Sequence, residues 1–150
     1  MKAIAFKGGK AGFEWAVVEG DDRTTASVTI RKKATAPADI REKELFWVAK
    51  EVRGLLSTYA PDRAAILEIG GGSLSGSIVA RIEVDGVIRS TLGEASLPTA
   101  SIKTVSLPKN FGVKKDGYPA LVATIDCIAS VARTNQDLVA LAVSQLPTAP

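Results

Sequence analysis

The first third of the chain carries three short runs whose pattern is typical of β-strands. Residues 2–6 are mostly apolar, and apolar and polar positions alternate over residues 13–19 and again over residues 25–32. Glycines separate the first two runs, and an acidic segment at residues 20–22 separates the last two, which indicates tight turns. The pattern therefore predicts a three-stranded antiparallel meander over residues 2–32.

After residue 37 the spacing of apolar positions changes from two to three or four, which is typical of a helix. Asp39 is followed three residues later by Glu42, the pattern of a capping box, so we expect this helix to begin at Asp39. Its predicted buried face consists of Leu45, Val48, Val52, Leu55, Leu56 and Tyr59.

The rest of the chain alternates between strand and helix patterns. Strands are predicted over residues 61–69 and 99–106, and helices over residues 77–95, 119–133 and 138–146, with residues 135–137 as the cap of the last one. A lysine-rich loop is predicted between them, over residues 107–117.

A meander followed by strand-helix alternation predicts an α/β fold with a mixed five-stranded sheet and helices on both faces. A chain of 150 residues, 46% of them hydrophobic, is long enough to bury the core of one domain. We expect a single domain over residues 1–146 and a frayed tail over residues 147–150.

Composition excludes several kinds of site and setting. The chain has no histidine, which excludes histidine-ligated zinc sites and histidine-dependent nucleophiles. The single cysteine, Cys127, lies in an apolar periodic segment and is predicted to be a buried small hydrophobe. Neither a signal-peptide pattern nor a membrane-spanning apolar run occurs, and these features together predict a cytoplasmic protein without a membrane partner.

The net charge of +3 and the pI near 9.1 permit a polyanionic partner without requiring one. Basic residues gather in two places, a run at residues 31–33 and the segment from Lys103 to Lys115, and an ordinary solvated loop is the favoured interpretation of either cluster. Trp15 and Trp47 are predicted to be core or interface residues rather than platforms for stacked bases.

Glu68 is the first candidate site residue. It ends an apolar strand two residues before the glycine run at residues 70–72. Open α/β sheets place ligand sites at the carboxyl ends of their strands, and a buried carboxylate needs a partner or a metal ion. A carboxylate at a fraying strand end, solvated or capping the next helix, is the alternative.

Several segments resemble a known family. The predicted order of elements resembles the ribonuclease H-like fold, and the sequence Phe-Glu-Trp-Ala-Val-Val-Glu-Gly at residues 13–20 resembles the first hairpin of RuvC-type Holliday-junction resolvases. Tyr-Ala-Pro-Asp at residues 59–62, followed by the strand with Glu68, resembles that family's fourth strand. Further matches are the opening residues 1–9, the helix at residues 81–95 with Pro98, the segment Val113-Lys114-Lys115, which resembles a basic patch of the family, and the closing helix at residues 137–142.

The resemblance implies a two-metal site formed by carboxylates of the first strand, the fourth strand and the last helix. Glu68 and Asp137 match two of these positions and are the predicted catalytic and metal-binding residues, with Mg²⁺ or Mn²⁺ as the cofactor of an active enzyme. Lys7 stands where the family has its first-strand aspartate, and Thr134 or Asn135 stands at the remaining carboxylate. The resemblance thus predicts a degenerate site in which Lys7 could pair with Glu68 or Asp137.

Three functional hypotheses follow. The first is a RuvC-like nucleic-acid-binding or scaffolding protein, acting on DNA or another structured nucleic acid. The second is a metal-dependent endonuclease that cuts branched or structured DNA. The third is an S-adenosylmethionine-binding domain, because residues 66–72 resemble the strand and glycine loop of methyltransferases. The predicted phosphate contacts of the first hypothesis are Lys7, Lys10, Lys103, Lys109, Lys114 and Lys115.

The apolar faces of the helices around residues 45–59 and 77–95 offer a homodimer interface, as the resemblance implies. Packing of the same faces within one chain is the alternative.

Overall fold

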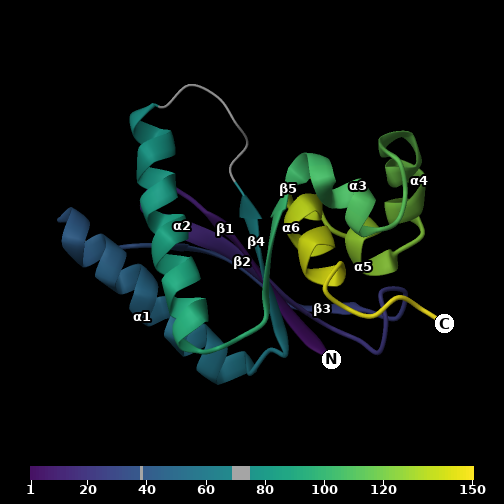
Figure 1. The fold of residues 1–150 in the computed structure, drawn as a ribbon, viewed down its shortest axis with the longest axis horizontal. Coiled ribbons are helices and arrows are strands. Elements are labelled where there is room, and N and C mark those ends of the chain that lie inside the picture. The colour runs from purple at the N-terminus through teal and green to yellow at the C-terminus, as the bar shows by residue number, and fades with distance from the viewer. Residues whose placement is uncertain (38, 69–74) are drawn as a thin grey trace.

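The computed structural model describes residues 1–37, 39–68 and 75–150, and these contain the predicted five-stranded mixed sheet. The strand order is β3-β2-β1-β4-β5, with β1, β2 and β3 antiparallel and β4 and β5 parallel to β1 (Figure 1). The bounds of the strands are Lys2–Gly8 for β1, Gly12–Glu19 for β2, Ser27–Thr35 for β3, Arg63–Glu68 for β4 and Thr99–Lys103 for β5.

Helices cover both faces of the sheet. The long helices α1 and α2 lie on one side, and the short helices α3 to α6 lie on the other (Figure 1). We call these sides the α2 face and the α6 face. The helices are α1 (Arg41–Tyr59), α2 (Gly76–Glu94), α3 (Leu107–Asn110), α4 (Tyr118–Ala123), α5 (Asp126–Ala129) and α6 (Arg133–Val143), and two 3-10 turns, η1 (Thr104–Ser106) and η2 (Lys115–Gly117), flank α3.

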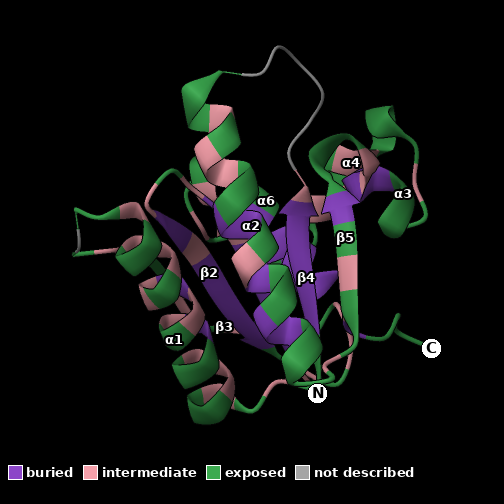
Figure 2. Ribbon diagram, turned by 60° about the vertical axis from the view of Figure 1, so that its left-hand side comes forward, coloured by how far each residue is buried: buried purple, intermediate pink, exposed green. Residues whose placement is uncertain are grey.

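Each face has its own hydrophobic core, because successive side chains of a strand point to opposite sides. On β1, Ala3 and Ala5 pack on the α6 face, whereas Ile4 and Phe6 pack on the α2 face. The central strands are buried along most of their length (Figure 2). The strand pattern of residues 2–6 lacks alternation for this reason.

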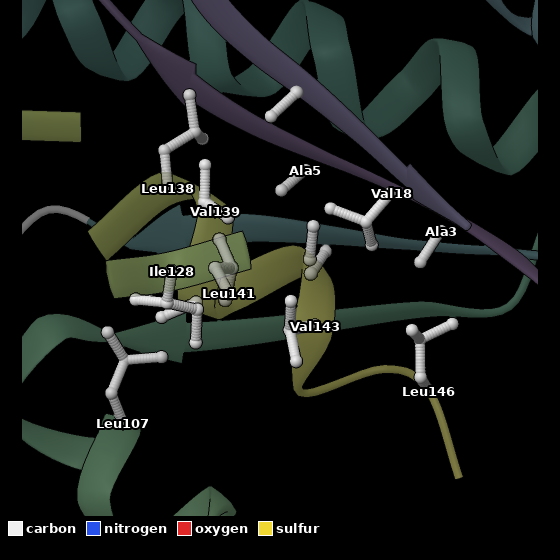
Figure 3. Close-up of a cluster of buried hydrophobic side chains, with 14 of the residues drawn as sticks. Ala3, Ala5, Val18, Leu107, Ile128, Leu138, Val139, Leu141, Val143 and Leu146 are labelled. Atoms are coloured by element: carbon white, nitrogen blue, oxygen red, sulfur yellow. The ribbon is translucent and has the colours of Figure 1, made fainter. Parts of the chain in front are cut away.

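Helix α6 is the central element of the α6-face core. All residues from Leu138 to Val143 are buried, because the helix packs on β1, β2 and β4 on one side and against α3 and α5 on the other. Figure 3 shows Leu138, Val139 and Leu141 of α6 lying between the strands and Ile128. The second half of α6 is apolar on all sides, which is typical of a fully buried segment.

The structure differs from the sequence predictions mainly at helix ends. Asp39 does not cap α1, whose N-cap residue is Ile40 without a side-chain cap bond, so the predicted capping box is wrong. The helix predicted over residues 119–133 is two short helices that break near Thr124, whose hydroxyl donates to the Leu121 carbonyl and competes with the helical backbone pattern. Helix α6 begins at Arg133, so residues 135–137 lie within it.

Other predictions of the core are confirmed. Trp15 and Cys127 are buried, and Trp47 is partly buried against the α2-face core. Within the described ranges, no helix has both the length and the apolar composition to cross a membrane. The predicted glycine loop at residues 70–72 lies outside the described residues.

Arg23, in the loop between β2 and β3, ties the meander to the end of α6. Its guanidinium donates hydrogen bonds to the carbonyl oxygens of Asn110 (2.8 Å), Ser144 (2.8 Å) and Leu146 (3.1 Å). The same group lies 5.1 Å from the ring centroid of Phe111. One side chain therefore satisfies carbonyl groups from two separate segments.

We expect Arg23→Met to lower the free energy of unfolding by about 2–3 kcal/mol, because partly buried carbonyl groups lose their donors while the apolar stem is kept. Urea denaturation at an unchanged m-value measures the effect. The control is Arg133→Met, since Arg133 is exposed and makes no side-chain hydrogen bond within the described residues. Equal losses in the two variants would contradict this role of Arg23.

Helix α2 packs on the end of β1 through Asp85 and Gly8. The side chain of Asp85 is buried, with 6% of the residue exposed, and lies against the Cα of Gly8. A Cβ atom at Gly8 would fall 1.9 Å from Oδ1 of Asp85. The absence of a side chain at Gly8 therefore lets α2 approach the sheet.

We expect Gly8→Ala to destabilise the fold by about 1–3 kcal/mol through overpacking, and the double change Gly8→Ala/Asp85→Ala to recover part of the loss. Thermal and urea unfolding of both variants check this prediction. The matched control is Gly86→Ala, one position from Asp85 in α2, where a Cβ meets nothing within 4 Å and should stabilise the helix by roughly 0.5–1 kcal/mol. A stabilising effect of Gly8→Ala would disprove the close approach.

Candidate nucleic-acid interface

A row of charged side chains crosses the end of the sheet at Lys7. The strand register places Lys7 of β1 opposite Glu14 of β2, and Glu14 opposite Lys33 of β3. Residues opposite each other in a sheet point to the same face. Ala5 and its partner on β2 belong to the α6-face core, so the row belongs to the α6 face as well.

Glu14 is the acidic member of this row and is already paired. Its carboxylate lies 3.9 Å from Nζ of Lys7 and 3.2 Å from a guanidinium nitrogen of Arg31 on β3. The Lys7, Glu14 and Arg31 side chains are 39%, 29% and 25% exposed, respectively. Partial burial makes these pairs less screened than surface pairs. The three side chains together carry a net positive charge, and Lys33 adds to it.

Glu68 points to the opposite face of the sheet. It shares a side of β4 with Ile66, which packs in the α2-face core. The carboxylate of Glu68 lies 3.6 Å from a guanidinium nitrogen of Arg89 on α2. The Glu68 side chain is 33% exposed, so this strand-end carboxylate is partly solvated and is also paired with an arginine of α2.

Lys7 and Glu68 are thus not brought together. The parallel register pairs Phe6 of β1 with Ile66 of β4. The next residues, Lys7 and Leu67, therefore lie side by side, and Leu67 packs on the α6 face. A shift of one residue along a strand reverses the face. The ion pair between Lys7 and Glu68 that the sequence permitted does not form, and Lys7 pairs with Glu14 instead.

Asp137 is exposed on α6, and the C-terminal end of that helix lies beside Met1 and Arg63, at the starts of β1 and β4. Its N-terminal half, with Asp137, therefore lies toward the end of the sheet where Lys7 is found. Burial, with a smaller contribution from the Asp137 carboxylate, raises the pKa of Tyr118 to about 12. Thr134 and Asn135 fall in the first turn of the same helix.

Asp85 is a buried carboxylate that sequence patterns did not single out. Burial raises the pKa of Asp85, and the nearby Arg81 and Arg89 guanidinium groups partly offset the effect. Oδ1 of Asp85 and Nε of Arg81 are buried without hydrogen-bond partners among the described residues. The signal that could have found this cluster is the four-residue spacing of Arg81, Asp85 and Arg89 on one helix face.

A groove of about 570 Å³ lies at the carboxyl end of β1. The β1–β2 turn, the end of β3 and the first turns of α2 form its walls, so it runs across the end of the sheet. We call it the hairpin-end groove. Its charged lining residues are Lys7, Lys10, Lys33, Arg81 and Glu14.

The six lysines predicted as phosphate contacts fall in three places. Lys7 and Lys10 line the hairpin-end groove, whereas Lys103 and Lys109 line a second cavity of about 660 Å³ beside the edge strand β5, together with Glu68. Lys114 and Lys115 are exposed near η2. The groove also contains two cations missing from that set, Lys33 and Arg81, because only the folded chain brings β3 and α2 to the β1–β2 turn.

The comparisons with known proteins identify the fold. No protein-family model and no curated protein sequence matches the chain. Among solved structures, Thermus thermophilus RuvC superposes with a TM-score of 0.74 at 16% sequence identity, over 96% of this chain and 92% of that chain. The same protein in complex with a Holliday junction substrate gives a TM-score of 0.73 at 15% identity, over 96% and 91% of the two chains.

The yeast mitochondrial Holliday junction resolvase Ydc2 is also similar, with a TM-score of 0.62 at 6% identity, over 95% of this chain and 77% of that chain. These likenesses span nearly the whole chain and agree with the observed mixed sheet and its helices on both faces. The chain therefore has the ribonuclease H-like fold of the RuvC-type resolvases.

Proposed function

We propose that the protein is a RuvC-like nucleic-acid-binding or scaffolding module that does not act as a two-metal nuclease. The observation that carries the proposal is the Lys7–Glu14–Arg31 cluster at the end of β1. It puts a net positive charge where the resolvase resemblance expects a metal-binding carboxylate. The solved complex of Thermus thermophilus RuvC with a Holliday junction substrate supports DNA as the class of partner.

The donor set supports the second half of the proposal. A pair of Mg²⁺ or Mn²⁺ ions needs several oxygen ligands that converge on one place. Here Glu14 is engaged by two cations, and Glu68 is engaged by Arg89 on the opposite face. Within residues 1–37, 39–68 and 75–150, no three acidic or cysteine side chains gather as a metal site would require. The residues present do not fit a two-metal centre.

The charge of this end of the sheet also supports nucleic-acid binding without metal ions. A lysine ammonium near a metal position repels a divalent cation, and pairing removes most of the negative field that would recruit one. The same positive charge attracts the phosphates of a nucleic acid, and each neutralised phosphate releases bound counterions. The exchange of a carboxylate for Lys7 therefore favours binding of DNA without metal-assisted hydrolysis.

We expect the protein to bind a fluorescently labelled four-way DNA junction with an affinity that falls steeply with added salt and is the same in EDTA as in Mg²⁺. Fluorescence anisotropy over a range of NaCl concentrations measures both properties, and the slope of log K against log salt should be negative. A heat-unfolded sample is the control for nonspecific adsorption. Affinity that does not change with salt, or no binding at low salt, would contradict the proposal.

Isothermal titration of Mg²⁺ and Mn²⁺ tests the second half of the proposal, that the protein does not form a two-metal centre. We expect no saturable heat with the wild type or with Lys7→Ala, and a weak saturable binding with Lys7→Asp, which places carboxylates on neighbouring strands beside Glu14. Binding to the wild type that disappears in Glu68→Gln, together with cleavage of the DNA junction, would establish the metal-dependent endonuclease instead.

A further inference from the structure

We propose that the hairpin-end groove is the surface that holds the phosphodiester backbone of the bound nucleic acid, with protein cations serving in place of metal ions. The inference rests on the proposed function and specifies where and through which groups the nucleic acid is bound.

The charge of the groove is the first argument. Among the described residues that line it, four are cations, namely Lys7, Lys10, Lys33 and Arg81, and one, Glu14, is acidic. Glu14 is already paired with Lys7 and with Arg31. Among the described residues, the other three lining cations, which are Lys10, Lys33 and Arg81, have no carboxylate oxygen within ion-pair distance. Lys10 and Lys33 are also exposed and are therefore available to an external anion, whereas Arg81 additionally faces the buried Asp85 carboxylate.

The origin of these cations is the second argument. Lys10 comes from the β1–β2 turn, Lys33 from the end of β3 and Arg81 from α2. Lysine side chains are long and flexible, so they bind phosphates as point charges over a range of positions. A groove with charges on three walls fits an extended, repeating anion better than one small anion.

The start of α2 adds to the field. Ser77 and Ile78, in the first turn of this 19-residue helix, line the groove. The N-terminal end of a helix carries a partial positive charge that stabilises phosphate groups. This contribution has the same sign as the lining cations and strengthens their attraction for the backbone of a nucleic acid.

The lining also indicates what part of the nucleic acid is recognised. Phe13 is the aromatic residue of the groove, and only 2% of it is exposed, so it cannot stack on a base. Lysine and arginine contacts to phosphates position a nucleic acid without reading its sequence. We therefore expect binding through this groove to be independent of base sequence.

Strand β3 offers a matched pair of variants. Lys33 lines the groove, whereas its neighbour Lys32 is opposite Trp15 and belongs to the other face of the strand. Both lysines are exposed, so Lys33→Gln and Lys32→Gln remove the same charge from adjacent positions of one element. Lys10→Gln is the second groove variant, in a turn rather than a strand.

The experiment is anisotropy titration of a mixed-sequence DNA duplex with each purified variant over a series of salt concentrations, with circular dichroism to verify folding. We expect Lys33→Gln and Lys10→Gln each to weaken binding by about threefold or more and to reduce the salt slope by about one, as for a lost phosphate contact. Lys32→Gln should change neither quantity measurably. A second duplex of unrelated sequence should give the same affinities.

The outcomes separate the two proposals. Equal losses in Lys32→Gln and Lys33→Gln, or no loss in either groove variant, would overturn the groove assignment and leave nucleic-acid binding intact. Absence of binding by the wild type would overturn the proposed function itself. Competition by inorganic phosphate or ATP at the concentration of duplex phosphate would mean a small-anion site, which also overturns the assignment to a polymer backbone.

Discussion

The alternation of side chains along the two central strands is the constraint on which the rest of this structure depends. Both β1 and β4 are buried on two faces, so every residue must suit the core on its own side. Ala3 and Ala5 leave room for α6, while Ile4 and Phe6 fill the space under α1 and α2. The same alternation determines the face of the sheet to which each side chain at the strand ends points.

At the strand ends, the register offsets the two charged positions that the family resemblance placed together by one residue, so their side chains point to opposite faces of the sheet. Lys7 continues the α6-face series of β1, and Glu68 continues the α2-face series of β4. Each charge then pairs with what its own face provides, Glu14 for Lys7 and Arg89 for Glu68. The result is two separate ion-pair clusters in place of one acidic centre.

The proposed function follows from the sign of the charge at this end of the fold. A RuvC-like scaffold that keeps acidic ligands attracts divalent cations, and the cations in turn bind phosphates. The same scaffold with lysine and arginine side chains at the strand ends attracts phosphates directly. The packing of Gly8 against Asp85 holds α2 close to the β1–β2 turn, so Arg81 and the start of α2 become part of the same groove.

Local patterns determined the order of strands and helices, and hence the mixed sheet, because periods of two and of three to four residues reflect burial on one side of each element. They also predicted the buried Cys127 and Trp15. Short helices and caps were less predictable. The Thr124 hydroxyl donates a hydrogen bond to the Leu121 carbonyl where a longer helix was predicted, and Ile40 is an N-cap residue without a side-chain cap bond.

The partners of the charged residues were decided only by the tertiary structure. The sequence does not determine whether Glu68 and Lys7 point to the same face of the sheet, because that depends on the register between β1 and β4, and a shift of one residue would change it. Nor does it place Lys33 and Arg81 beside Lys10, since these residues come from three elements that meet only when the sheet and α2 pack together. Sequence alone determined the kinds of residue available for binding, and three-dimensional packing determined which of them act at one site.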